Sequence, residues 1–97
     1  MKKRTTSTPG SPKGSPPDHP AEARAANRGG GVVARLLIRE DGNVGQICLI
    51  SVDPPGYGFD QAAVQALGQW RFEPATVDGT AVASYSIRYV AWSIGSR

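Results

Sequence analysis

One segment, residues 59–74 (FDQAAVQALGQWRFEP), constrains the fold of this chain more than any other. Its apolar residues recur at steps of three and four, which places them along one side of an α-helix. These residues are Phe59, Ala62, Ala63, Ala66, Leu67 and Trp70. Asp60 can cap the first turn, and Pro74 prevents continuation. The pattern therefore predicts a helix from Phe59 to about Gln69 or Trp70.

Four large side chains in this segment are predicted to form the structural core: Phe59, Leu67, Trp70 and Phe72. A chain of 97 residues makes one domain, and it buries roughly 60–65% of its unfolded surface. Aromatic residues then supply a large share of the buried area. Trp70→Ala is predicted to cost roughly 3–5 kcal/mol of stability.

The flanking segments have the patterns of one short helix and three strands. Residues 18–28 suit a short helix that Asp18 or His19 can cap. Residues 32–40 alternate as a strand, a turn follows at residues 41–43 (DGN), and residues 44–52 return as a second strand. Alternation in this second strand is poor, so the pattern does not assign its inward face. Residues 81–92 alternate as a third, half-exposed strand.

The order of elements is therefore α-β-β-α-β. It predicts an α+β fold, in which a small antiparallel three-stranded sheet carries two helices packed on one face. Chain order does not force a neighbour on both sides of the third strand. We therefore expect one edge of the sheet to be open, and an open edge is a template for a further strand.

The charge distribution separates a basic N-terminal segment from a near-neutral domain. Residues 1–31 hold six basic and two acidic residues, whereas residues 32–97 hold five arginines and six acids. Residues 1–17 are predicted to be a disordered, extended linker rich in Pro, Ser and Gly; residues 18–92 form the domain and 93–97 a tail. Lys2–Lys13 could contact anionic lipid or nucleic acid, or could simply be solvated. No nucleic-acid surface is expected on the folded domain.

The residue patterns that mark catalytic, metal or cofactor sites are missing from the sequence, so no enzyme activity, metal or cofactor is expected. Cys48, the one cysteine, sits in an apolar run and is predicted to be a buried structural thiol. The sequence has no apolar run long enough for a transmembrane helix, and its basic start lacks the apolar region of a signal peptide.

A binding module remains, and the open edge of the third strand is its candidate site. An extended peptide can add to such an edge through backbone hydrogen bonds. The candidate partner-binding residues are Ser84, Tyr85, Ser86, Ile87, Arg88 and Tyr89. Two alternatives stay open for these side chains: the tyrosines can belong to the core, and Arg88 can be solvated.

The order of several motifs resembles the C-terminal domain of TonB, the energy transducer. These motifs are PAEAR (20–24), GVV (31–33), DGNV (41–44), FDQAAVQALGQWRFEPA (59–75) and DGTAV (78–82). The resemblance covers about residues 18–92. It implies a periplasmic domain that binds the TonB box of an outer-membrane active transporter as an added strand along the last strand of the sheet, here residues 84–89.

The resemblance also implies coupling to the proton-motive force through an inner-membrane complex of the ExbB and ExbD type. Members of the family carry an N-terminal transmembrane helix, which this sequence lacks. The ExbB/ExbD partner is therefore expected only if such a helix lies upstream. The alternative is a free-standing domain whose open edge pairs with a second copy.

Overall fold

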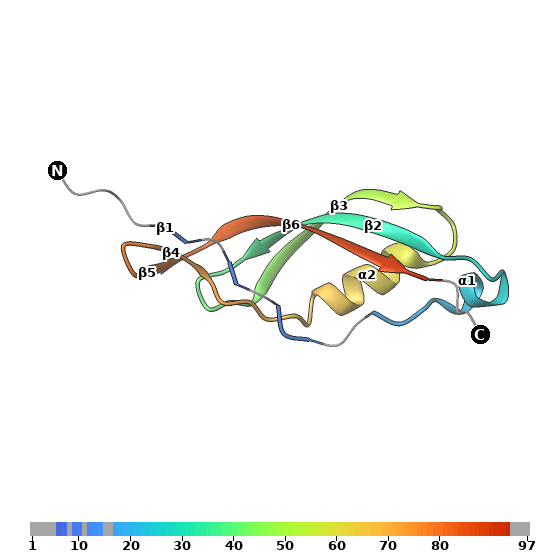
Figure 1. Cartoon of the computed structure of the whole chain (residues 1–97), viewed down its shortest axis with the longest axis horizontal. Coiled ribbons are helices and arrows are strands. Elements are labelled where there is room, and N and C mark those ends of the chain that lie inside the picture. Colours follow the sequence, from blue (N-terminus) through green and yellow to red (C-terminus); the bar gives the residue numbers. More distant parts are fainter. Residues whose placement is uncertain (1–5, 8, 11, 15–16, 94–97) are drawn as a thin grey trace.

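The computed structural model describes residues 6–7, 9–10, 12–14 and 17–93. Figure 1 shows an elongated molecule in which α2 lies beneath a curved sheet and α1 lies at one end. The elements are β1 (Thr6–Ser7), α1 (Ala21–Ala25), β2 (Gly30–Ile38), β3 (Val44–Asp53), α2 (Phe59–Leu67), β4 (Ala75–Val77), β5 (Thr80–Val82) and β6 (Ser84–Trp92).

The main sheet has three antiparallel strands in the order β3-β2-β6, so β2 is central. The inner face of β2 is fully buried and consists of Val32, Ala34, Leu36 and Ile38, the face that alternation predicted. The α+β class with a three-stranded antiparallel sheet and two helices is therefore confirmed.

Helix α2 packs its buried side against β2 and β3. Phe59, Ala63 and Leu67 are fully buried, as the spacing of three and four predicted. The predicted cap is wrong, because the helix begins two residues earlier than a cap at Asp60 requires. Gly58 holds the N-cap position at a φ of 85°, a conformation that favours glycine, and no side chain caps the helix.

The helix ends before Trp70, which changes the surroundings of that residue. Trp70 is partly buried and packs against the core, whereas Phe72 is 5% exposed. The indole also contacts the N-terminal segment, since a Cβ built on Gly14 would lie 2.3 Å from Trp70 Cδ1. We therefore expect Trp70→Ala to cost less than the 3–5 kcal/mol typical of a fully buried aromatic residue.

Two bulges explain why the alternation of β3 is poor. The register with β2 shifts between Val33 and Ala34 and again between Leu37 and Ile38, where β3 carries one extra residue each time. Each extra residue reverses the phase of the side chains that follow it. The residues of β3 that reach the core are therefore unevenly spaced: Val44, Ile47, Leu49 and Val52.

The short helix α1 is held at the end of the sheet by hydrogen bonds between side chains and backbone carbonyls. Its N-cap is Pro20 without a side-chain hydrogen bond, so the predicted caps Asp18 and His19 are wrong. Instead, Trp92 Nε1 donates to the Asp18 carbonyl at 2.9 Å, and a hydrogen bond of 2.9 Å joins His19 Nε2 to the Arg28 carbonyl. Ala23 is fully buried in the core.

A second small sheet has the order β1-β4-β5 and was not anticipated from the sequence. Described residues of the predicted linker pair with the segment that follows α2. Gly10 N–H donates to the Glu73 carbonyl at 2.9 Å, and Lys13 and Arg71 exchange backbone hydrogen bonds of 2.7 and 2.9 Å. Lys2, Lys3 and Arg4 lie outside the described residues, and contact of the segment Lys2–Lys13 with lipid or nucleic acid stays a prediction.

The turn between β2 and β3 contains a carboxylate with a shifted pKa. The Asn43 N–H donates to Asp41 Oδ1 at 3.0 Å and the Asn43 amide donates to Asp41 Oδ2 at 2.9 Å. These bonds, the backbone bond foremost, hold the pKa of Asp41 below its ordinary value.

A depressed pKa in the folded state means that the Asp41 contribution to stability is present above the pKa of the unfolded chain. It is lost as the pH falls through the lower, folded-state pKa. In an NMR titration of the carboxyl carbons, we expect Asp41 to titrate below the ordinary pKa of an aspartate. A midpoint at or above that ordinary value would contradict the hydrogen bonding of this turn.

The prediction that Cys48 is a buried thiol is wrong. Cys48 is exposed, because the bulges of β3 turn it to the outer face, opposite Arg35. We expect one thiol per chain to react within minutes with a colorimetric thiol reagent at neutral pH without denaturant. A thiol that reacts only after denaturation would contradict the orientation of β3.

Candidate functional site

Strand β6 forms one edge of the main sheet. It pairs with β2 along nine residues, from Gly30↔Trp92 to Ile38↔Ser84, without a register shift. No other strand within the described ranges pairs with β6. Its second edge therefore presents a regular row of backbone groups, the arrangement that strand addition requires.

The opposite edge of the sheet, on β3, is also unpaired in the described part of the chain, but it is irregular. The two bulges of β3 interrupt its row of donors and acceptors. Bulges of this kind bend and twist an edge, which disfavours pairing with another strand. One open edge was expected from the chain order, and of the two edges present, that of β6 is the one suited to a further strand.

The backbone direction along β6 follows from the hydrogen bonds of the first hairpin. Arg39 N–H donates to the Asn43 carbonyl at 2.8 Å, so the backbone groups of Arg39 point towards β3. By the alternation of the strand, those of Leu37 and Arg35 point the same way. The alternate residues of β2 point towards β6 and pair there with Ser84, Ser86 and Arg88.

The remaining residues of β6 therefore turn their N–H and C=O groups to the open edge. Within the candidate site these are Tyr85, Ile87 and Tyr89, and Ala91 follows them in the same alternation. Three of the six predicted partner-binding residues thus present backbone groups at the open edge. The other three, Ser84, Ser86 and Arg88, direct theirs towards β2.

The side chains of Tyr85, Ile87 and Tyr89 lie on the outer face of the sheet and are 59%, 64% and 68% exposed. The alternative in which the tyrosines belong to the core is therefore excluded. The Arg35 guanidinium lies 4.8 Å from the centre of the Tyr85 ring, and the Tyr89 ring covers Gly31, where a Cβ would come within 2.5 Å of the tyrosine oxygen.

The opposite, inner face of β6 is polar in its first half. Ser84, Ser86 and Arg88 are half-buried. Arg88 Nε donates to Ser86 Oγ at 3.2 Å, and its guanidinium lies 5.0 Å from the centre of the Phe72 ring. The Ser84 Oγ is buried and has no hydrogen-bond partner among the residues that the structure describes. Arg88 is therefore packed rather than freely solvated, and its contact with Phe72 was not foreseen.

The second half of the inner face anchors the strand. Val90 and Trp92 are each 7% exposed, and the Trp92 ring lies 4.8 Å from the Phe59 ring, at an interplanar angle of 41°. The sequence pattern missed this change, because the chemistry of the inner face switches from polar to apolar within one strand.

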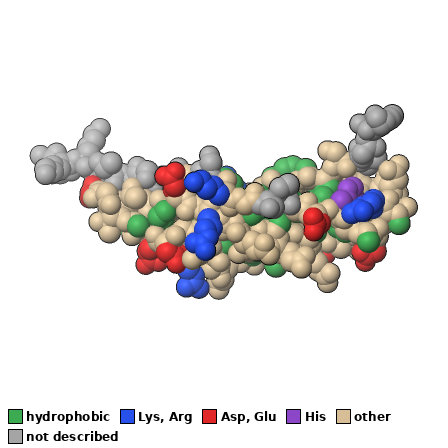
Figure 2. Space-filling view, turned by 90° about the horizontal axis from the view of Figure 1, so that it is seen from below, with side chains coloured by type: hydrophobic (Ala, Val, Ile, Leu, Met, Phe, Trp, Pro, Cys, Tyr) green, Lys and Arg blue, Asp and Glu red, His purple; other side chains and the backbone are tan. Residues whose placement is uncertain are grey.

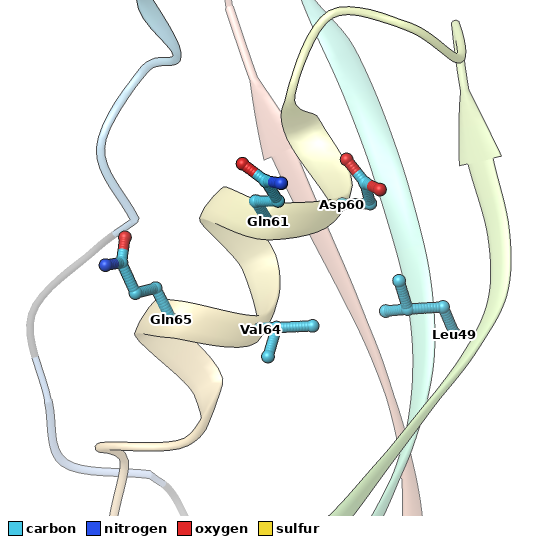
Figure 3. A pocket seen from close by; sticks show the side chains of 5 residues that line it. All are labelled: Leu49, Asp60, Gln61, Val64 and Gln65. Atoms are coloured by element: carbon cyan, nitrogen blue, oxygen red, sulfur yellow. The ribbon is translucent and has the colours of Figure 1, made fainter.

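A groove of about 420 Å³ lies between α2 and β3. Figure 3 shows Val64 and Leu49 facing one another across it, with Asp60, Gln61 and Gln65 along the helix. The groove is open and borders the bulged edge of the sheet. Its described polar lining consists of one carboxylate and two amides.

The charges on the domain are mixed. Figure 2 shows the face seen from below in Figure 1, where basic and acidic side chains are interspersed. Within the described ranges, no group of three His, Cys, Asp or Glu side chains could hold a metal ion, and no described helix is long and apolar enough to cross a membrane. The expected lack of enzyme activity stays a prediction.

Comparison with known proteins supports one family. Residues 15–93 match the family described as Gram-negative bacterial TonB protein C-terminal. The chain is 32% identical over 82 residues to protein TonB of Pseudomonas aeruginosa; this covers 84% of the chain and 24% of that protein. The chain thus spans about a quarter of the length of this relative.

A solved structure agrees with this match. The solution NMR structure of the Pseudomonas aeruginosa TonB CTD superposes with a TM-score of 0.73 at 31% identity, covering 90% of this chain and 88% of that one. The sequence match, the fold and the resemblance of the motifs agree. The chain belongs to the family of the Gram-negative bacterial TonB protein C-terminal domain.

Proposed function

We propose that this domain is a non-enzymatic energy-transducer domain that binds the TonB box of an outer-membrane active transporter by strand addition to β6. It would thereby support transport driven by the proton-motive force. The domain would act on the periplasmic side of the inner membrane, and an ExbB/ExbD-type complex would be its partner only where a transmembrane helix precedes it.

The regular open edge of β6 is the observation that carries this proposal. Its nine residues pair with β2 without a bulge, and by the alternation of the strand Tyr85, Ile87 and Tyr89 direct backbone groups outwards. Their exposed side chains add apolar area beside the same edge. An extended peptide gains affinity from the first feature and specificity from the second.

The same edge favours a second candidate function, in which two copies of the domain pair through β6 as a structural dimer. The charges of β6 oppose it. The strand SYSIRYVAW holds one arginine and no acid, so an antiparallel pair centred on Arg88 places two like charges opposite each other.

A peptide titration followed by backbone NMR tests the proposal. A TonB-box peptide should shift the amide signals of residues 84–89 most strongly, while those of α1 change little. Shifts that avoid β6, or the lack of binding, would refute strand addition. Light scattering at several protein concentrations tests the second function. A chain that stays monomeric at every concentration excludes the structural dimer, whereas a dimer that persists when the TonB-box peptide is added would favour it.

A further inference from the structure

The two faces of β6 differ in chemistry, and this difference constrains any strand that adds to it. The outer face presents Tyr85, Ile87 and Tyr89, whereas the inner face presents two serines and Arg88. Side chains of an added strand alternate between the same two faces. Each ligand residue therefore meets either the apolar row or the polar row, but not both.

On the inner face, Arg88 is placed to receive an acceptor from a neighbouring strand. Its guanidinium is held between Phe72 and Ser86, which reduces the rotamer freedom that an arginine loses on binding. The guanidinium has several N–H donors, and its Nε donor goes to the Ser86 hydroxyl rather than to a carboxylate. Helix α2 packs mainly against β2 and β3, whereas the ring in contact with the Arg88 guanidinium is that of Phe72, which lies beyond the end of α2.

On the outer face, the cation beside the candidate site is Arg35, whose backbone lies on β2 and not on the edge strand β6. Arg35 belongs to β2 and is engaged with the ring of Tyr85. Strands are spaced by about 4.8 Å, so an added strand lies about 4.8 Å from β6 and about 9.6 Å from β2. A carboxylate on the outer face would thus lie beside tyrosine and isoleucine side chains, and the guanidinium of Arg35 is already engaged with the Tyr85 ring.

We propose that β6 binds an extended segment in one fixed phase, which means that each residue of the segment faces a set side of the sheet. Every second residue is apolar and faces the outer row. The alternate residues include a carboxylate that faces Arg88. This inference rests on the proposed strand addition and goes beyond it, because it assigns Arg88 as the residue that sets the phase. A second copy of β6 offers no carboxylate and does not meet this requirement.

Three synthetic peptides test the phase. Each peptide has a core of eight residues in which valine alternates with threonine. The core is flanked by Gly-Ser, and the peptide carries a fluorescent label. The in-phase peptide has glutamate in place of a central threonine, the out-of-phase peptide has it in place of a central valine, and the neutral peptide has glutamine at the in-phase position. Binding is measured by fluorescence anisotropy with the wild-type chain, Arg88→Gln and Arg39→Gln. Arg39 is a matched control, because it is an exposed arginine outside β6.

We expect the in-phase peptide to bind the wild-type chain about fivefold more tightly than the neutral one, as for a partly shielded ion pair. This preference should disappear in Arg88→Gln and persist in Arg39→Gln, and the out-of-phase peptide should bind more weakly than the in-phase one. Equal affinities of the in-phase and out-of-phase peptides, or a preference that survives in Arg88→Gln, would overturn the inference. If no peptide shifts the amide signals of β6, strand addition itself fails, which is a distinguishable result.

Discussion

Replacing Phe59 by alanine should lower the free energy of unfolding by about 3–5 kcal/mol, the range for a buried aromatic residue. Phe59 is fully buried, and its ring lies 4.8 Å from that of Trp92 and 6.1 Å from that of His19. It also packs on the backbone of Gly30, where a Cβ would come within 2.6 Å of the ring. Small domains have a total stability of about 5–15 kcal/mol, so this loss is large. Urea denaturation followed by tryptophan fluorescence measures it.

Two further variants of the same region serve as controls. Val64 lies on α2 and is 42% exposed, so Val64→Ala should change the stability by no more than about 0.5 kcal/mol. Trp70→Ala should fall between Val64→Ala and Phe59→Ala, because Trp70 is partly buried. A loss for Phe59→Ala no greater than that for Val64→Ala would show that α2 does not pack as described.

Replacing Ile87 by proline should weaken the binding of a TonB-box peptide by at least about fivefold and leave the domain folded. By the alternation of β6, the N–H of Ile87 points to the open edge, and proline removes that donor without breaking the ladder to β2. A carbonyl of the ligand then loses its partner, which costs about 1–3 kcal/mol. Anisotropy titration measures the affinity, and thermal melting measures whether the fold persists.

Ile87→Thr and Ser86→Pro are the controls for this variant. Threonine keeps the N–H and the strand preference, so it should reduce affinity less than proline does. Ser86 pairs with Leu36 of β2, so proline there removes a hydrogen bond of the sheet and should lower the melting temperature strongly. If Ile87→Pro unfolds the domain and Ser86→Pro does not, the backbone direction assigned to β6 is reversed.

The sequence was sufficient to predict the elements whose side chains follow a single period. The spacing of Phe59, Ala63 and Leu67 marked the buried side of α2, and the alternation of Val32, Ala34 and Leu36 marked the inner face of β2. Both patterns arise because one continuous face of the element meets the core. The order of elements and the fold class followed from them.

The features that the sequence did not reveal depend on partners distant in the chain. The bulges of β3 are set by its register with β2, and they decide that Cys48 is exposed. In β6, the apolar tyrosines and isoleucine face outwards and the polar residues face inwards, because the buried pair Val90 and Trp92 sets the phase of the strand. Local alternation reports that two faces differ, but not which of them meets the core.

The pairing of residues 10 and 13 with the segment after α2 is a further example. A stretch rich in Pro, Ser and Gly has too few apolar residues to predict docking. It docks here through backbone hydrogen bonds, which leave no trace in side-chain patterns. The open edge was foreseen from chain order alone, although the order could not distinguish the regular edge of β6 from the bulged edge of β3.

Hydrogen exchange at the amides of β6 is the most direct test of the central claim, that β6 has an unpaired edge which accepts a peptide strand. In the free domain, the amides of Tyr85, Ile87 and Tyr89 should exchange quickly, while those of Ser86 and Arg88, paired with β2, exchange slowly. Saturation with a TonB-box peptide should slow the first three by at least about tenfold. Slow exchange of these three amides in the free domain, or unchanged exchange when the peptide is bound, would contradict the account.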